Sequence, residues 1–160
     1  MMVILILLAI VLALFVGAFL SKRRFGVLGL GLAAGAIISP IWGDTAGFVV
    51  SSTGVVNEGP LVNAIALSLL ILLPAVLFMF HGYTYKHIFG RIIGSFLFTL
   101  LAVAFLAGPI ATTLLLTGPV GNVYNWVVSN HKLIVSIGVA LAVADFLISK
   151  TAHKSDKKHH

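Results

Sequence analysis

Residues 2–24 read MVILILLAIVLALFVGAFLSKRR, an apolar run closed by one serine and three basic residues. A run of about 20 apolar residues is long enough to cross the roughly 30 Å hydrocarbon core of a bilayer as a helix. The basic residues follow the run instead of preceding it, and the run exceeds the core of a secretory signal peptide. The stretch therefore predicts a first transmembrane helix over 2–20, with its end anchored on the cytoplasmic side.

Composition places the whole chain in the same class. The sequence is 60% hydrophobic and 9% charged, whereas a soluble domain has about a quarter of its residues charged. The net charge of +6 sits in short runs at predicted helix ends, which favours anionic lipid headgroups as partner over nucleic acid. The chain has no cysteine, so disulfides, thiolate nucleophiles and cysteine-ligated metals are excluded.

The apolar runs predict an all-α membrane bundle of five transmembrane helices that forms a single domain over 1–149. A polar tail, 150–160, is expected to be disordered. The polar stretch 44–59 predicts an exposed loop or an amphipathic segment on the membrane, and 117–131 a polar loop of which 123–128 dips into the interface. The five predicted spans are 2–20, 25–43, 60–80, 92–116 and 132–149.

The distribution of lysine and arginine supports both the number and the direction of these spans. With the N-terminus outside and the C-terminus in the cytoplasm, only Lys132 falls outside, and a four-span arrangement would split the basic residues between the two sides. The cytoplasmic basic residues are Lys22, Arg23, Arg24, Lys86, Arg91, Lys150, Lys154, Lys157 and Lys158. The first three are expected to contact lipid headgroups, in a prokaryotic cytoplasmic (inner) membrane.

Small residues recur at four-residue spacing, which puts them on one face of a helix and lets a second backbone approach closely. Tight packing within the bundle is the first interpretation, and an oligomer interface or a gating contact is the alternative. One further stripe runs through Ser136, Ala140 and Ala144. The predicted packing positions are Gly31, Gly35, Gly90, Gly94, Gly108, Gly138 and Ala142.

Asp145 is the only acidic residue inside a predicted span. A carboxylate within a membrane is costly unless it is paired. Arg91 enters the fourth span on the same side, so we predict an intramembrane Asp145–Arg91 ion pair, with Lys86 as the substitute partner. A proton or cation site at Asp145, or a carboxylate that reaches cytoplasmic water, are the alternatives.

No catalytic or cofactor-binding motif is present. The sequence has no Gly-x-Ser-x-Gly elbow, no phosphate-binding glycine loop and no His-Glu-x-x-His. His81 and His87 stand six apart, a spacing that does not suit two metal ligands on one helix. We therefore predict no catalytic residue, no cofactor and no metal site.

Two stretches resemble the colicin V production protein (CvpA) family of small bacterial inner-membrane proteins. One is FLSKRRFGVLGLGLAAG (19–35), a basic turn that runs into a glycine-rich helix, and the other is HIFGRIIGSFLFTLLAVAF (87–105). The resemblance covers about 1–115 and includes an outer segment at 44–59. It implies a role near export, envelope upkeep or membrane assemblies, and no catalytic residue. The chain departs from the family by its fifth span and by the lack of an acid after Arg24.

The sequence thus predicts a non-catalytic membrane protein that is a structural or accessory component, either of a larger assembly with other subunits or of a homo-oligomer. The alternative is a small channel or transporter whose pathway forms between protomers, with Asp145 as the ion-sensitive residue.

Overall fold

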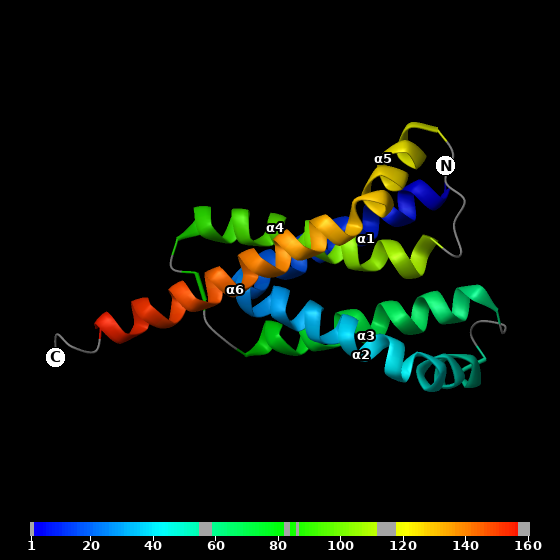
Figure 1. Ribbon diagram of the computed structural model, residues 1–160, viewed down its shortest axis with the longest axis horizontal. Coiled ribbons are helices and arrows are strands. Elements are labelled where there is room, and N and C mark those ends of the chain that lie inside the picture. Colours follow the sequence, from blue (N-terminus) through cyan, green and yellow to red (C-terminus); the bar gives the residue numbers. More distant parts are fainter. Residues whose placement is uncertain (1, 55–58, 82–83, 86, 112–117, 157–160) are drawn as a thin grey trace.

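The computed structural model describes residues 2–54, 59–81, 84–85, 87–111 and 118–156. Within them the chain forms six helices and no strand (Figure 1). They are α1 (Met2–Ser21), α2 (Phe25–Ser52), α3 (Pro60–Phe80), α4 (Ile88–Ala111), α5 (Gly118–Ser129) and α6 (His131–Asp156). The predicted all-helical class is confirmed.

The long helices run roughly along one axis, with the two chain termini at opposite ends of the molecule (Figure 1). α2 and α3 pack side by side, α1 packs on α4, and α6 contacts both α2 and α4. α4 is the central helix, since it touches each of the other five, and α2 contacts α3, α4 and α6. The buried Leu28 and Leu32 of α2 meet Phe98 and Leu101 of α4 in the core.

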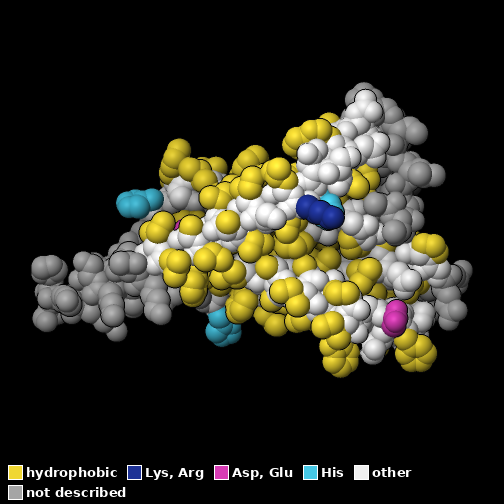
Figure 2. All heavy atoms as spheres, viewed as in Figure 1, with side chains coloured by type: hydrophobic (Ala, Val, Ile, Leu, Met, Phe, Trp, Pro, Cys, Tyr) yellow, Lys and Arg dark blue, Asp and Glu magenta, His cyan; other side chains and the backbone are white. Residues whose placement is uncertain are grey.

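Four helices are long and apolar enough to cross a membrane, as judged from their length and composition. These segments are Phe25–Ser52, Pro60–Phe80, Ile88–Ile110 and His131–Ile148, and Leu5–Ser21 is a shorter apolar helix among the described residues. Hydrophobic side chains cover much of the visible surface along the helices (Figure 2). Exposed leucine, isoleucine and phenylalanine over this length are typical of helices that face lipid.

Helices occupy parts of two stretches that were predicted to be polar connections. The stretch 44–59, predicted to be an exposed loop or an amphipathic segment on the membrane, is helical up to Ser52, because α2 continues past Pro40. Packing against α3 explains the extension, because Gly47 lies against the Asn63 side chain. The expected polar loop 117–131 contains the helix α5, whose Tyr124 hydroxyl donates to the carbonyl oxygen of Ala107 on α4 at 2.9 Å.

The predicted disordered tail is also partly helical, since α6 continues to Asp156. Extending an existing helix adds one hydrogen bond for each residue fixed and needs no new nucleus. Polar residues can therefore prolong the apolar span without a core. The final residues, 157–160, lie outside the described part of the chain, as do 112–116 of the predicted fourth span.

Glycines on two faces of α2 let its neighbours approach closely. A methyl group added at Gly35 would lie 2.7 Å from the carbonyl oxygen of Leu70 on α3. On another face, a methyl group at Gly26 would lie 2.6 Å from the carbonyl oxygen of Ala142 on α6. Both distances are shorter than van der Waals contact, so these backbones pack directly on α2.

We expect Gly35→Ala to lower the thermal unfolding temperature in mild detergent, because the added methyl group meets backbone atoms that cannot rotate away. Overpacking of this kind costs about 1–3 kcal/mol. Gly108→Ala is the matched control, since no described atom lies within 4 Å of a methyl group there. The control should be neutral or stabilised by up to about 1 kcal/mol through higher helix propensity. Equal losses in both variants would contradict this packing account.

Candidate functional site

A set of polar side chains lies at the end of the bundle where α1 ends, α2 begins, α3 ends and α4 begins. We call this region the capped end and define it as the turn 22–24, the described residues of the connection 81–87 (His81, Thr84, Tyr85 and His87) and the side chains of Arg91 and Asp145. Helix ends leave backbone N–H and C=O groups without partners within the helix. A membrane protein has to satisfy these groups from its own atoms wherever water is absent.

Two side chains from distant parts of the chain cap the start of α2. The Arg24 side chain makes no capping hydrogen bond there. The Asp145 carboxylate of α6 accepts the Gly26 N–H at 2.8 Å, and the Tyr85 hydroxyl accepts the Phe25 N–H at 3.2 Å. The negative charge of Asp145 also lies at the positive end of the α2 dipole. The carboxylate therefore caps a helix that lies 119 residues away in the sequence.

Arg23 caps the end of α3. Its Nε donates to the Met79 carbonyl oxygen at 3.0 Å, and its Nη2 donates to the Phe80 carbonyl oxygen at 2.7 Å. A cation at a helix C-terminus is favourable because the last carbonyl groups carry partial negative charge. The guanidinium thus ties the turn after α1 to the last residues of α3.

Arg91 of α4 makes an equivalent contact with the end of α1. Its Nη2 donates to the Phe19 carbonyl oxygen at 2.8 Å, and the guanidinium carbon lies 4.3 Å from the centre of the Phe19 ring. The Arg91 Nε is buried and has no hydrogen-bond partner among the described residues. The cation–π contact offsets part of that cost.

Tyr85, in the connection between α3 and α4, also contacts the turn between α1 and α2. Its backbone N–H donates to the Lys22 carbonyl oxygen at 2.9 Å. Its ring fills a notch on α4, because a methyl group at Gly90 or Gly94 would lie 2.9 or 2.6 Å from ring atoms. Burial raises the pKa of the Tyr85 hydroxyl above its usual value, so the group is neutral at physiological pH.

The sequence-predicted ion pair is located within this arrangement. Arg91 contacts the end of α1, and Asp145 accepts from the start of α2. Each charge has a backbone partner, and the Asp145–Arg91 pair itself stays a prediction. Its substitute partner Lys86 lies outside the described residues.

The basic residues expected at lipid headgroups differ in their surroundings. Lys22 is exposed, whereas Arg23 and Arg24 are half-buried. Arg23 serves α3, and the Arg24 guanidinium carbon lies 5.4 Å from the centre of the Tyr85 ring. Lys22 is therefore the best placed of the three for a headgroup, and this contact stays a prediction.

The predicted small-residue positions fall into different surroundings. Gly31 and Gly35 face α3, Gly138 faces Leu101 of α4, and Ala142 is fully buried against α2. As described above, Gly90 and Gly94 form the Tyr85 notch, while Gly108 meets no described atom. Sequence reasoning missed Gly26 and Gly29, both of which lie against α6. Their spacing of three on a glycine-rich helix is the signal that was available.

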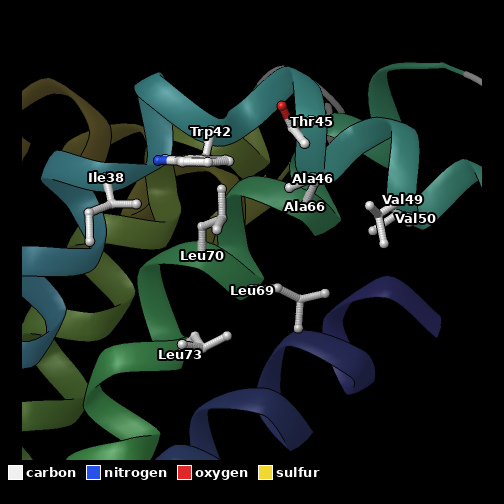
Figure 3. Close-up of a pocket in the computed structure, with 10 residues that line it drawn as sticks. All are labelled: Ile38, Trp42, Thr45, Ala46, Val49, Val50, Ala66, Leu69, Leu70 and Leu73. Carbon is white, nitrogen blue, oxygen red and sulfur yellow. The ribbon is translucent and has the colours of Figure 1, made fainter.

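Two apolar cavities open between the helices. The larger, of about 440 Å³, lies between α2 and α3 (Figure 3). Thr45 is its only polar side chain, and the other lining residues are Ile38, Trp42, Ala46, Val49, Val50, Ala66, Leu69, Leu70 and Leu73. The smaller, of about 220 Å³, lies between α4 and α6 around Leu101 and Gly138. Neither cavity offers a cluster of polar groups to a charged substrate.

The buried hydroxyl groups of the described residues bond to their own helices. Ser39 donates to Ala36, Ser95 to Arg91 and Thr99 to Ser95, in each case to a backbone carbonyl oxygen. No group of three or more histidine, aspartate or glutamate side chains that could hold a metal ion occurs among the described residues. The hydrogen bonds of Arg23, Tyr85, Arg91 and Asp145 at the capped end each connect two elements of the bundle.

Comparison of the chain with protein-family models, with curated proteins and with solved structures finds no match.

Two substitutions at Asp145 separate the hydrogen bond that its carboxylate accepts from the effect of its negative charge. Asp145→Asn keeps an oxygen that accepts the Gly26 N–H and should lose only the interaction with the helix dipole, about 0.3–1 kcal/mol. Asp145→Leu leaves that N–H unsatisfied, and we expect a further loss of about 1–3 kcal/mol. Thermal unfolding in detergent measures both, with the exposed Asp44→Asn as the control. Equal effects of asparagine and leucine at 145 would contradict the capping role.

A double-mutant cycle with Arg91→Gln tests the predicted ion pair against separate capping. If Arg91 serves α1 and Asp145 serves α2, the losses of Asp145→Asn and Arg91→Gln should add to within about 0.5 kcal/mol. If the two side chains pair directly, the double variant should lose little more than either single variant. The same unfolding assay measures all four proteins.

Proposed function

We propose that this chain is a five-span integral membrane protein, with its N-terminus outside and its C-terminus in the cytoplasm. In this proposal α1 crosses the membrane in addition to α2, α3, α4 and α6, and the capped end faces the cytoplasm. The protein is a non-catalytic component of a membrane assembly, formed with other subunits or with further copies of itself. The resemblance of 1–115 to the CvpA family supports an inner-membrane setting near export or envelope upkeep.

The observation that carries the proposal is that most of α6 is exposed on the outside of the bundle. Only 6% of its apolar window is buried, against 50% for α2 and 50% for α4. Its inward face is a single line through Gly138, Ala142 and Asp145, whereas the stripe of Ser136, Ala140 and Ala144 points away from the bundle and is exposed. Small residues on an exposed membrane face permit close approach of another helix.

The use of the polar side chains supports the non-catalytic part of the proposal. Asp145, Tyr85 and Arg91 each bond to the end of a helix, and the described cavities are lined almost entirely by apolar residues. A water-filled path or a catalytic relay needs polar groups that converge on a shared space. Those at the capped end point at backbone atoms instead.

Native mass spectrometry after extraction in mild detergent tests the assembly. We expect a defined homo-oligomer or a stoichiometric complex, and we expect Ala140→Phe to dissociate it by blocking close approach at α6. Ala9→Phe makes the same change at an exposed position on α1 and should leave the complex intact. A monomer under all conditions would overturn the proposal. An ion flux in liposomes that Asp145→Asn abolishes would favour the channel alternative.

The orientation has its own test, because the chain contains no native cysteine. Single cysteines at two exposed positions, His87→Cys and Ser129→Cys, report on opposite sides of the membrane. In intact cells a membrane-impermeant maleimide should label position 129 directly, and position 87 only after permeabilisation. The reverse pattern, or labelling of both positions in intact cells, would contradict the proposed topology.

A further inference from the structure

The assembly proposal leaves the short helix α5 without a role. We propose that α5 is an interfacial helix, which lies at the headgroup boundary of the bilayer with lipid against its outward face. The proposal requires the flanking helices to be spans and does not depend on the oligomeric state.

The position of α5 along the chain places it at a membrane surface. It follows one candidate span, Ile88–Ile110, and precedes another, His131–Ile148. Its 12 residues extend about 18 Å at 1.5 Å per residue, less than the roughly 30 Å needed to cross. Figure 1 shows α5 beside the end of α4, at the end of the molecule where the N-terminus lies.

Hydrogen bonds fix α5 to both neighbouring helices. The Tyr124 hydroxyl donates to the Ala107 carbonyl oxygen of α4 at 2.9 Å. Toward α6 the helical pattern continues through Asn130, whose N–H donates to Trp126 and whose carbonyl accepts from Ile134, both at 3.0 Å. The depth of α5 in the membrane is therefore coupled to the depth of both spans.

The outward face of α5 has the mixed chemistry of an interface. Val123 is 65% and Trp126 is 63% exposed, and the exposed side chains around them are Asn122, Asn125 and Ser129. In the hydrocarbon core the two asparagine amides would lose their hydrogen bonds to water. In bulk water the indole and the valine would stay exposed. At the headgroup level the apolar groups reach the acyl boundary and the amides stay hydrated.

Trp42 of α2 provides an independent marker of the same level. It is 57% exposed and lies about 26 Å along the helix from Phe25, at 1.5 Å per residue. It is thus nearly one bilayer thickness from the capped end, with Asp44 two positions further on. The two tryptophans of the chain are both exposed, and Trp42 lies in the second half of α2, ten residues before its end at Ser52.

Contacts of α5 with lipid would add to the few packing contacts that α6 makes with the bundle. α6 has the least buried apolar window of the four candidate spans, and a line of small residues connects it to α2 and α4. Lipid contacts through Val123 and Trp126 would hold its far end at a fixed depth, while Asp145 holds the other end on α2.

Fluorescence quenching in phosphatidylcholine vesicles tests the proposal. Trp42→Phe leaves Trp126 as the only indole, and Trp126→Phe leaves Trp42. Nitroxide lipids carry the quencher near the glycerol or near the end of the acyl chain. We expect both indoles to lose more emission to the shallow nitroxide than to the deep one. If Trp42→Phe fails to fold, subtracting the Trp126→Phe signal from that of the wild-type protein recovers Trp126.

Three outcomes for Trp126 would overturn the proposal. Stronger quenching by the deep nitroxide would mean that α5 re-enters the membrane. Quenching by aqueous iodide but by neither lipid would place α5 in water. Protection from all three quenchers would mean that protein, either a second copy or another subunit, covers the face.

Discussion

The structure depends on the requirement that helix ends near a membrane find partners for their backbone groups. At the capped end several of these partners come from another helix or from a connection and not from the same helix. Asp145 and Tyr85 serve the start of α2, Arg23 the end of α3 and Arg91 the end of α1. Each charge has the sign that its helix dipole favours. The four polar side chains therefore connect the helices, because each hydrogen bond also fixes the relative position of two elements.

The capping contacts are possible because glycine lets the backbones come close. Asp145 reaches Gly26 only because α6 packs directly on the start of α2, with Ala142 against Gly26 and Gly29. Tyr85 reaches the same helix end from a notch that glycines leave open on α4. In a membrane the hydrophobic effect contributes little to helix association, so close packing and interhelical hydrogen bonds supply it together. At this end of the bundle the interhelical hydrogen bonds need the close packing, and the close packing alone leaves the helix ends without partners.

The sequence predicts the parts of the fold that follow from local pattern. Apolar runs give the long helices, and four-residue spacing gives the contacts of Gly31 and Gly35 with α3. The extension of α2 to Ser52 and the helix α5 depend on packing against Asn63 and Ala107, and hydropathy carries no signal for such partners. The capping role of Asp145 could not be predicted from the sequence for the same reason. A buried acid near an arginine predicts an ion pair, which stays a prediction, but it does not point to the distant Gly26 N–H from which the carboxylate accepts a hydrogen bond.

The two ends of the bundle then differ in what holds them. Polar contacts that involve α1, α2, α3, α4 and α6 close the capped end, so a helix there moves only if several hydrogen bonds break together. At the opposite end α5 meets α4 through the hydrogen bond of Tyr124 to Ala107. The small-residue stripe Ser136, Ala140 and Ala144 of α6 is exposed and runs along the helix toward the capped end. A second membrane helix can pack on that stripe without disturbing any capping contact. In the proposed assembly, the surface of α6 that meets a partner is therefore separate from the capping contacts that hold the protomer together.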